Sequence, residues 1–156
     1  MNVLRRTFLK SLGAGSALAA LVVAGLLRPV QALAAEWNKA AFDAKDLAGA
    51  LKGLGAGGAV DSKDLVIKAS DIAENGAVVP VDVVSRIPNT TQISVLVEKN
   101  PNPLAASFSF ANGALPEVHV RLKFSETSIL KVVATADGKT YTAHKEIKVT
   151  VGGCGG

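Results

Sequence analysis

The stretch Glu117-Val-His-Val-Arg-Leu-Lys-Phe124 decides the fold class, because apolar and polar residues alternate along it without interruption. Four apolar residues fall on one side of an extended chain, namely Val118, Val120, Leu122 and Phe124. Successive side chains of a β-strand point to opposite faces of the sheet. The stretch therefore predicts a strand of an antiparallel sheet, with one face in a core and the other in water.

The same period of two recurs outward from this stretch. We expect six further strands at residues 65–69, 77–85, 92–98, 105–110, 130–136 and 140–151, the last allowing a break near His144. Turn signals separate them at Pro88-Asn89, Asn112-Gly113 and the hairpin pair Asp137-Gly138. About seven short strands with turns every 8 to 12 residues or so predict a mainly β, immunoglobulin-like antiparallel β-sandwich.

A helical period precedes the strands. Between residues 36 and 54, apolar side chains recur at intervals of three and four, at Trp37, Ala40, Ala41, Ala44, Leu47, Ala48 and Leu51. This spacing predicts one amphipathic N-terminal helix that packs on the core and ends at Gly53 and Gly55. The glycine-rich segment after it lacks the Lys-Ser/Thr pair of a phosphate-binding loop, so we predict no nucleotide site there.

Composition argues against a nucleic-acid partner. The chain has 156 residues and is 49% hydrophobic, which suits one domain with its own core. Its net charge of +4 comes from Arg5, Arg6, Lys10 and Arg28, since residues 1–34 hold no acid and the remainder is balanced. The part after residue 34 therefore has no electrostatic footprint for nucleic acid or an anionic membrane.

Residues 1–34 have the three parts of a secretory signal: a basic start, an apolar middle and an Ala-x-Ala site at Ala32 to Ala34. Arg5 and Arg6, followed by Phe8-Leu9-Lys10, resemble a twin-arginine export signal. We expect export in the folded state to the periplasm and a mature start near Ala35. A membrane anchor is the alternative, which the short apolar run of about 17 residues disfavours.

The chain closes with Val151-Gly-Gly-Cys154-Gly-Gly156, which contains its only cysteine. Four glycines (Gly152, Gly153, Gly155 and Gly156) give this segment little bulk and wide conformational freedom, so we expect a flexible arm at residues 152–156 beyond a domain at 35–151. Cys154 is then a candidate covalent handle. A plain disordered tail and an interchain disulfide are the alternatives.

Other chemistry is poorly supported by the sequence. His119 and His144 fall on polar positions of predicted strands, and we interpret both as surface residues. Together with one cysteine they match no metal-ligand spacing, and neither has the neighbours of a catalytic group. We therefore predict no catalytic residue and no metal site.

Three stretches carry a resemblance to a known family: the tail from Lys148 to Gly156, the run Ile72-Ala-Glu-Asn-Gly-Ala-Val-Val-Pro80-Val81, and Asn100-Pro-Asn-Pro103 before the strand that contains Phe108. They resemble SoxY, the sulfur-carrier subunit of the bacterial thiosulfate-oxidising system. One departure is Val120-Arg-Leu-Lys-Phe124, where a Thr-Arg-Ile-Lys-Met-like run is expected, and it keeps the same pattern.

The resemblance implies a carrier rather than an enzyme, with Cys154 as the attachment site and no cofactor besides a thiosulfate or sulfane adduct. It also implies a heterodimer with a SoxZ-like subunit. A haem cytochrome, a metal-dependent sulfate-releasing hydrolase and a sulfur dehydrogenase are the implied enzymes.

Two other classes remain as alternatives. A ubiquitin-like sulfur carrier would use Gly155-Gly156, but such proteins work in the cytoplasm and export disfavours this reading. An exported immunoglobulin-like structural or interaction module would use Cys154 for an intermolecular disulfide.

Overall fold

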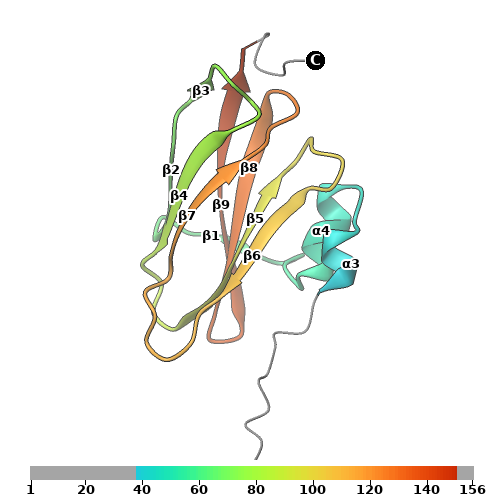
Figure 1. Ribbon diagram of the computed structural model, residues 1–156. Coiled ribbons are helices and arrows are strands. Elements are labelled where there is room, and N and C mark those ends of the chain that lie inside the picture. Colours follow the sequence, from blue (N-terminus) through green and yellow to red (C-terminus); the bar gives the residue numbers. More distant parts are fainter. Residues whose placement is uncertain (1–37, 151–156) are drawn as a thin grey trace, which may run out of the picture. The chain divides into compact units, whose positions relative to one another are not determined.

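The computed structural model describes residues 38–150, in which two helices precede nine strands (Figure 1). The helices are α3 (Lys39–Phe42) and α4 (Leu47–Gly53). The strands are β1 (Val60–Asp61), β2 (Leu65–Ala69), β3 (Ile72–Ala73), β4 (Val79–Ser85), β5 (Thr90–Val97), β6 (Leu104–Ser109), β7 (Glu117–Leu122), β8 (Ser128–Ala136) and β9 (Lys139–Val149).

The strands form two sheets that face each other across one core. The larger sheet has the order β1-β9-β8-β5-β6, with β3 also paired to β9, and the smaller has the order β2-β4-β7. All pairs among the longer strands are antiparallel. The predicted immunoglobulin-like antiparallel sandwich is therefore confirmed. Two-residue strands β1 and β3 run parallel to β9 and were not predicted, because two residues show no alternation.

The alternation of residues 117–124 appears in the structure as predicted. Val118, Leu122 and Phe124 are buried, Val120 is partly buried, and the residues between them are exposed. The buried residues join a core from both sheets that includes Val81, Val83, Ile93, Val95, Leu130, Val132 and Ile147. β7 thus contributes its apolar face to the core and leaves its polar face in water.

The predicted turns lie where the sequence put them. Asp137 and Gly138 both have positive φ, 48° and 71°, between the paired residues Ala136 and Lys139, as a tight hairpin requires. The break considered near His144 is absent, because His144 pairs with Lys131 in an uninterrupted β8–β9 register.

The single helix predicted over residues 36–54 is wrong. Asp46 is extended, with φ −140° and ψ 161°, and its carboxylate accepts a hydrogen bond from the Gly49 amide at 2.6 Å. Asp46 is therefore the N-cap of a new helix, and the chain between Phe42 and Leu47 is not helical. Ala40 and Ala48 are exposed, in disagreement with the predicted stripe.

The two helices cover the outer face of the larger sheet, beside β5 and β6 in Figure 1. Ala41 and Ala50 are fully buried and belong to a second apolar cluster that contains Leu96 and Val133 of the sheet. A Cβ on Gly53 would lie 2.7 Å from the Ala41 Cα, so glycine is needed for the close approach of α4 to α3. The predicted core-packing role of this region is confirmed, although its buried positions differ.

Candidate functional site: the arm base

The predicted attachment residue Cys154 and the glycines around it lie outside the described residues, as do Arg5 and Arg6. The structure describes the chain up to Thr150, directly after β9. What it shows of the candidate site is therefore how β9 is held at the point where residues 151–156 follow. We call the surrounding groups the arm base, which comprises residues 71–73, Gly76, Phe124, Thr127 and residues 148–150.

The end of β9 is hydrogen-bonded along both of its edges. On one edge β3 lies parallel to it, with Ile72 opposite Lys148. The Lys148 amide donates to the Asp71 carbonyl at 2.9 Å, and the Thr150 amide donates to the Ala73 carbonyl at 3.1 Å. On the other edge the Val149 amide donates to the Thr127 hydroxyl at 3.0 Å. Three successive amides are thus fixed up to the last described residue.

The segment that follows β3 packs tightly under β9. The Phe124 amide donates to the Gly76 carbonyl at 2.7 Å. A Cβ built on Gly76 would lie 2.6 Å from the Phe124 carbonyl oxygen and 2.9 Å from Cγ1 of Val149, so no other residue fits without a shift. Phe124 itself is fully buried. The segment after β3 therefore packs closely, at Gly76, between the main chain of Phe124 and the side chain of Val149.

A lysine closes the sandwich edge next to the arm base. Lys145 of β9 donates from Nζ to the Ala69 carbonyl at 2.6 Å and lies 2.8 Å from the Asp71 carboxylate. The hydrogen bond and the positive charge of Lys145 lower the pKa of Asp71 below its ordinary value. Because Ala69 belongs to β2 of the smaller sheet and Asp71 directly precedes β3, Lys145 ties the two sheets together near the end of β9.

Two large apolar side chains are exposed beside these contacts. Ile72 in β3 is 55% exposed, and Val78, which precedes β4, is 52% exposed. Figure 1 shows β3 next to the end of β9, at the opposite end of the sandwich from the β8–β9 hairpin. Exposed apolar side chains therefore lie both in the arm base, at Ile72, and next to it, at Val78.

The two histidines are surface residues, as the sequence predicted. His119 Nδ1 lies 2.9 Å from an Asp82 oxygen, and its Nε2 lies 3.4 Å from Glu117 Oε1. The hydrogen bond with Asp82 raises the pKa of His119, and the charges of Asp82 and Glu117 act in the same direction. Among residues 38–150, no group of three or more candidate ligands is arranged to hold a metal ion. In the same residues, no helix is both long and apolar enough to span a membrane.

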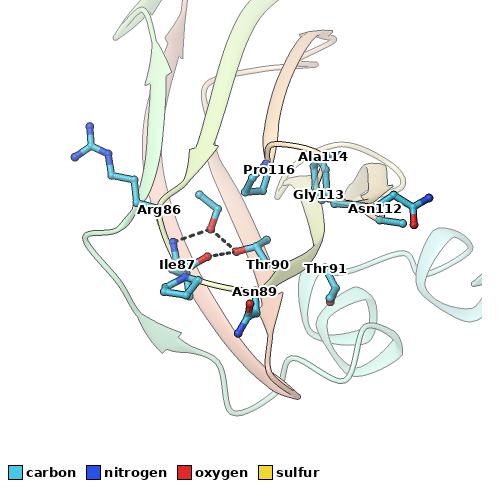
Figure 2. A pocket seen from close by; sticks show the side chains of 13 residues that line it. Arg86, Ile87, Asn89, Thr90, Thr91, Asn112, Gly113, Ala114 and Pro116 are labelled. Atoms are coloured by element: carbon cyan, nitrogen blue, oxygen red, sulfur yellow. Dashed lines mark hydrogen bonds between the residues drawn. The ribbon is translucent and has the colours of Figure 1, made fainter.

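A cleft of about 550 Å³ lies at the other end of the sandwich, lined by residues 85–91, 110–114 and Pro116 (Figure 2). The hydroxyls of Ser85 and Thr90 lie 2.7 Å apart, and Thr90 donates to the Ile87 carbonyl at 2.7 Å. In Figure 2 the Arg86 side chain extends away from this network. The hydroxyls serve to close the turn between β4 and β5, and the lining contains no histidine, cysteine or carboxylate.

Comparison with known proteins yields a family and two informative structures. The family model for the sulfur oxidation protein SoxY matches residues 52–154. The solved sulfur carrier protein SoxY from Chlorobium limicola f thiosulfatophilum is 43% identical with a TM-score of 0.56, over 61% of this chain and 88% of its own. A superoxide reductase (neelaredoxin) from Ignicoccus hospitalis is 21% identical with a TM-score of 0.50, over 55% and 79%, and shows likeness of fold alone. A comparison with curated proteins gives no match.

Proposed function

This chain belongs to the SoxY family of sulfur oxidation proteins, and we propose that it carries thiosulfate-derived sulfur on Cys154 during thiosulfate oxidation in the periplasm. The family membership agrees with the resemblance found in the sequence and supports a sulfur-carrier role. It also leaves the ubiquitin-like alternative without support. The observation that carries the proposal is that the family match extends to residue 154, the only cysteine of the chain.

The proposal divides the chain into three parts. Residues 1–34 act as a twin-arginine signal, residues 35–151 form the helical segment and sandwich, and residues 152–156 form the carrier arm. From Thr150 to Cys154 a fully extended chain spans at most about 14 Å. A base that is hydrogen-bonded up to Thr150 supports this arrangement, because it would give a carrier arm a fixed starting point.

Loading is an oxidation. The Cys154 thiol and the thiosulfate dianion form a sulfur–sulfur bond and release two electrons and one proton, and a haem cytochrome takes the electrons. Water then attacks the terminal sulfone at a metal-dependent hydrolase, which cleaves the bond to the sulfane sulfur and releases sulfate. A persulfide remains on Cys154, and a sulfur dehydrogenase oxidises it further. In this scheme the chain supplies no catalytic group and no cofactor of its own.

Physical chemistry explains why the cargo is tethered. Free sulfane intermediates would diffuse away, whereas a tethered adduct reaches each enzyme at a high effective concentration. Glycines remove side-chain bulk, so that one tip fits several active-site channels. A thiol without a neighbouring cation is only a few per cent thiolate at neutral pH, so activation belongs to the receiving enzyme.

The proposed stable partner is a SoxZ-like subunit in a heterodimer. The exposed Ile72 and Val78 beside the arm base support transient contacts with the enzymes that receive the arm. Such contacts would place the enzyme channel next to the residue at which the arm begins.

The decisive experiment is mass spectrometry of the C-terminal peptide after incubation with thiosulfate and the partner enzymes. We expect an adduct of about 112 Da on Cys154 that disappears on reduction. Cys154→Ser should abolish thiosulfate-dependent sulfate production while its circular dichroism spectrum stays unchanged. Full sulfate production by this variant would refute the proposal. If Cys154 is found only in disulfide-linked dimers, the structural-module alternative is correct instead.

A further inference from the structure

The loop between β5 and β6 contains Asn100-Pro-Asn-Pro103, a stretch that resembles the family but has no part in the arm base. The Val97 amide donates to the Pro103 carbonyl at 2.8 Å, and the Asn100 amide donates to the Val97 carbonyl at 3.2 Å. Pro103 is fully buried, and each proline fixes its own φ. The side chains of Asn100 and Asn102 are therefore presented by a loop of restricted shape.

The Asn100 side chain bonds to the main chain of residues 123–127, the connection between β7 and β8. Its Nδ2 donates to the Lys123 carbonyl at 2.7 Å, and its Oδ1 accepts from the Ser125 amide at 3.1 Å. The side-chain amide thus uses both its donor and its acceptor on two main-chain groups of one connection. This contact fixes the connection relative to the β5–β6 loop.

The same connection contacts the end of β9 by two routes. In the direct route, the Val149 amide donates to the Thr127 hydroxyl at 3.0 Å. In the other, the Phe124 amide donates to the Gly76 carbonyl at 2.7 Å, and a Cβ on Gly76 would lie 2.9 Å from Cγ1 of Val149. No hydrogen bond joins Asn100 itself to β9 within residues 38–150, so its influence on that strand passes through the connection.

We propose that Asn100 is a positioning residue for the carrier arm. By holding the connection it fixes Thr127 and Gly76, and these fix the end of β9 from which the arm starts. The inference rests on the proposed function, because an arm needs a defined origin only if Cys154 carries cargo. A carrier whose β9 end samples several positions presents its cargo correctly only part of the time, and its apparent affinity for a receiving enzyme falls by that fraction.

Asn102, two residues further along the loop, makes a different contact. Its Nδ2 donates to the Phe42 carbonyl at 2.9 Å, and its Oδ1 accepts from Nζ of Lys45 at 3.2 Å. These bonds hold the helical segment and not the β7–β8 connection. Because the two asparagines share a loop and a side-chain chemistry, the same substitution at Asn102 is a matched control.

Native-state hydrogen exchange measures the effect on position. The Val149 amide reports the end of β9, and the Val132 amide, in β8 between two partner strands, reports opening of the whole sandwich. A merely structural Asn100 would speed both amides together. In Asn100→Ala we expect the ratio of Val149 to Val132 exchange rates to rise about ten-fold, because two hydrogen bonds to the connection are lost. Asn102→Ala should leave this ratio unchanged.

A milder variant covers the case in which Asn100→Ala does not fold. Asn100→Asp keeps an acceptor for the Ser125 amide but has no donor for the Lys123 carbonyl when ionised. The same exchange ratio should rise in this variant.

A kinetic readout tests whether the position matters for the reaction. Carriers loaded with thiosulfate on Cys154 serve as substrates of the sulfate-releasing hydrolase, and sulfate release is measured at increasing carrier concentration. For Asn100→Ala we expect KM for the carrier to rise about three-fold with kcat unchanged, because fewer carriers are correctly positioned while the bond broken in the enzyme is the same. Asn102→Ala should keep both parental values.

Three results would overturn the proposal. An unchanged exchange ratio in the Asn100 variants would show that Asn100 does not hold the end of β9. An equal rise in Asn102→Ala would assign the effect to the loop as a whole, and a raised ratio with an unaltered KM would leave Asn100 a structural role only. Failure of the proposed function looks different, because the parent protein itself would then gain no thiosulfate adduct on Cys154, whatever the exchange ratios.

Discussion

Replacing Gly76 by alanine should loosen the end of β9 without changing any residue of that strand. The new methyl carbon would lie 2.6 Å from the Phe124 carbonyl oxygen, which is main chain and cannot rotate away. It would also lie 2.9 Å from Cγ1 of Val149. The segment that carries β3 must therefore move away from β9, and the bond from the Phe124 amide to the Gly76 carbonyl is strained or lost.

The expected cost follows from these two effects. Overpacking against a rigid neighbour costs about 1 to 3 kcal/mol. Weakening one buried main-chain hydrogen bond adds about 1 kcal/mol. A domain of this size loses roughly 4 °C in Tm for each kcal/mol of destabilisation, so Gly76→Ala should lower Tm by about 8 °C or more.

Thermal unfolding followed by circular dichroism measures the global effect, and hydrogen exchange at the Lys148 to Thr150 amides measures the local one. Gly58→Ala is the matched control, because a Cβ there meets no atom within 4 Å and Gly58 does not have positive φ. That control should leave Tm unchanged or raise it by up to about 4 °C, because alanine restricts the unfolded chain. The reasoning is refuted if Gly76→Ala and Gly58→Ala have the same Tm and the β9 amides of Gly76→Ala exchange at parental rates.

Three further predictions concern other contacts. Asp46→Ala removes the cap of α4 and should destabilise the protein by about 1 kcal/mol in urea unfolding, and an unchanged midpoint would contradict the capping role. Asp82→Asn should lower the pKa of His119 in an NMR titration, because Asp82 is the main cause of its elevation, with Glu117 contributing and Lys68 opposing. Since the folded-state pKa of His119 is raised, its contribution to stability is complete below about pH 6.5 and is lost as pH rises through the raised pKa. A difference in unfolding free energy between the parent and Asp82→Asn that does not change with pH would contradict this. Lys145→Met should raise the pKa of Asp71 and speed exchange of the Lys148 amide, and an unperturbed Asp71 titration would exclude the proposed tie.

The strands could be predicted because their signals are local. Residues 117–124 alternate without a break, and Asp137-Gly138 occupies the left-handed region that a two-residue hairpin needs. The bounds and buried faces of the helices could not be predicted in the same way. Alanines occur at so many positions between 40 and 50 that several apolar faces are compatible with the sequence. Asp46, a favourable cap residue, was the available sign of a second helix start.

The contacts that form the arm base could not be predicted from the sequence. Parallel pairing of Ile72 with Lys148 joins residues far apart in the chain, and β3 is too short to show a period. Two signals were present nonetheless. Asn75-Gly76 is a turn dipeptide, and Lys145 falls on the inward side of β9 between Ala143 and Ile147, which indicates a charged group with a partner at a sheet edge.

Both edges of β9 are hydrogen-bonded within the molecule, and this limits how a partner can bind at the end of the strand. A free edge beside the last residues of β9 would invite another strand to pair there and to extend along the chain that follows. β3 occupies that edge as far as the Thr150 amide, and Thr127 completes the opposite side. Strand addition by another chain to the end of β9 is thereby excluded. A partner that binds at this end of the sandwich must therefore contact β9 through side chains, such as that of the exposed Ile72 beside it, rather than by adding a strand to β9.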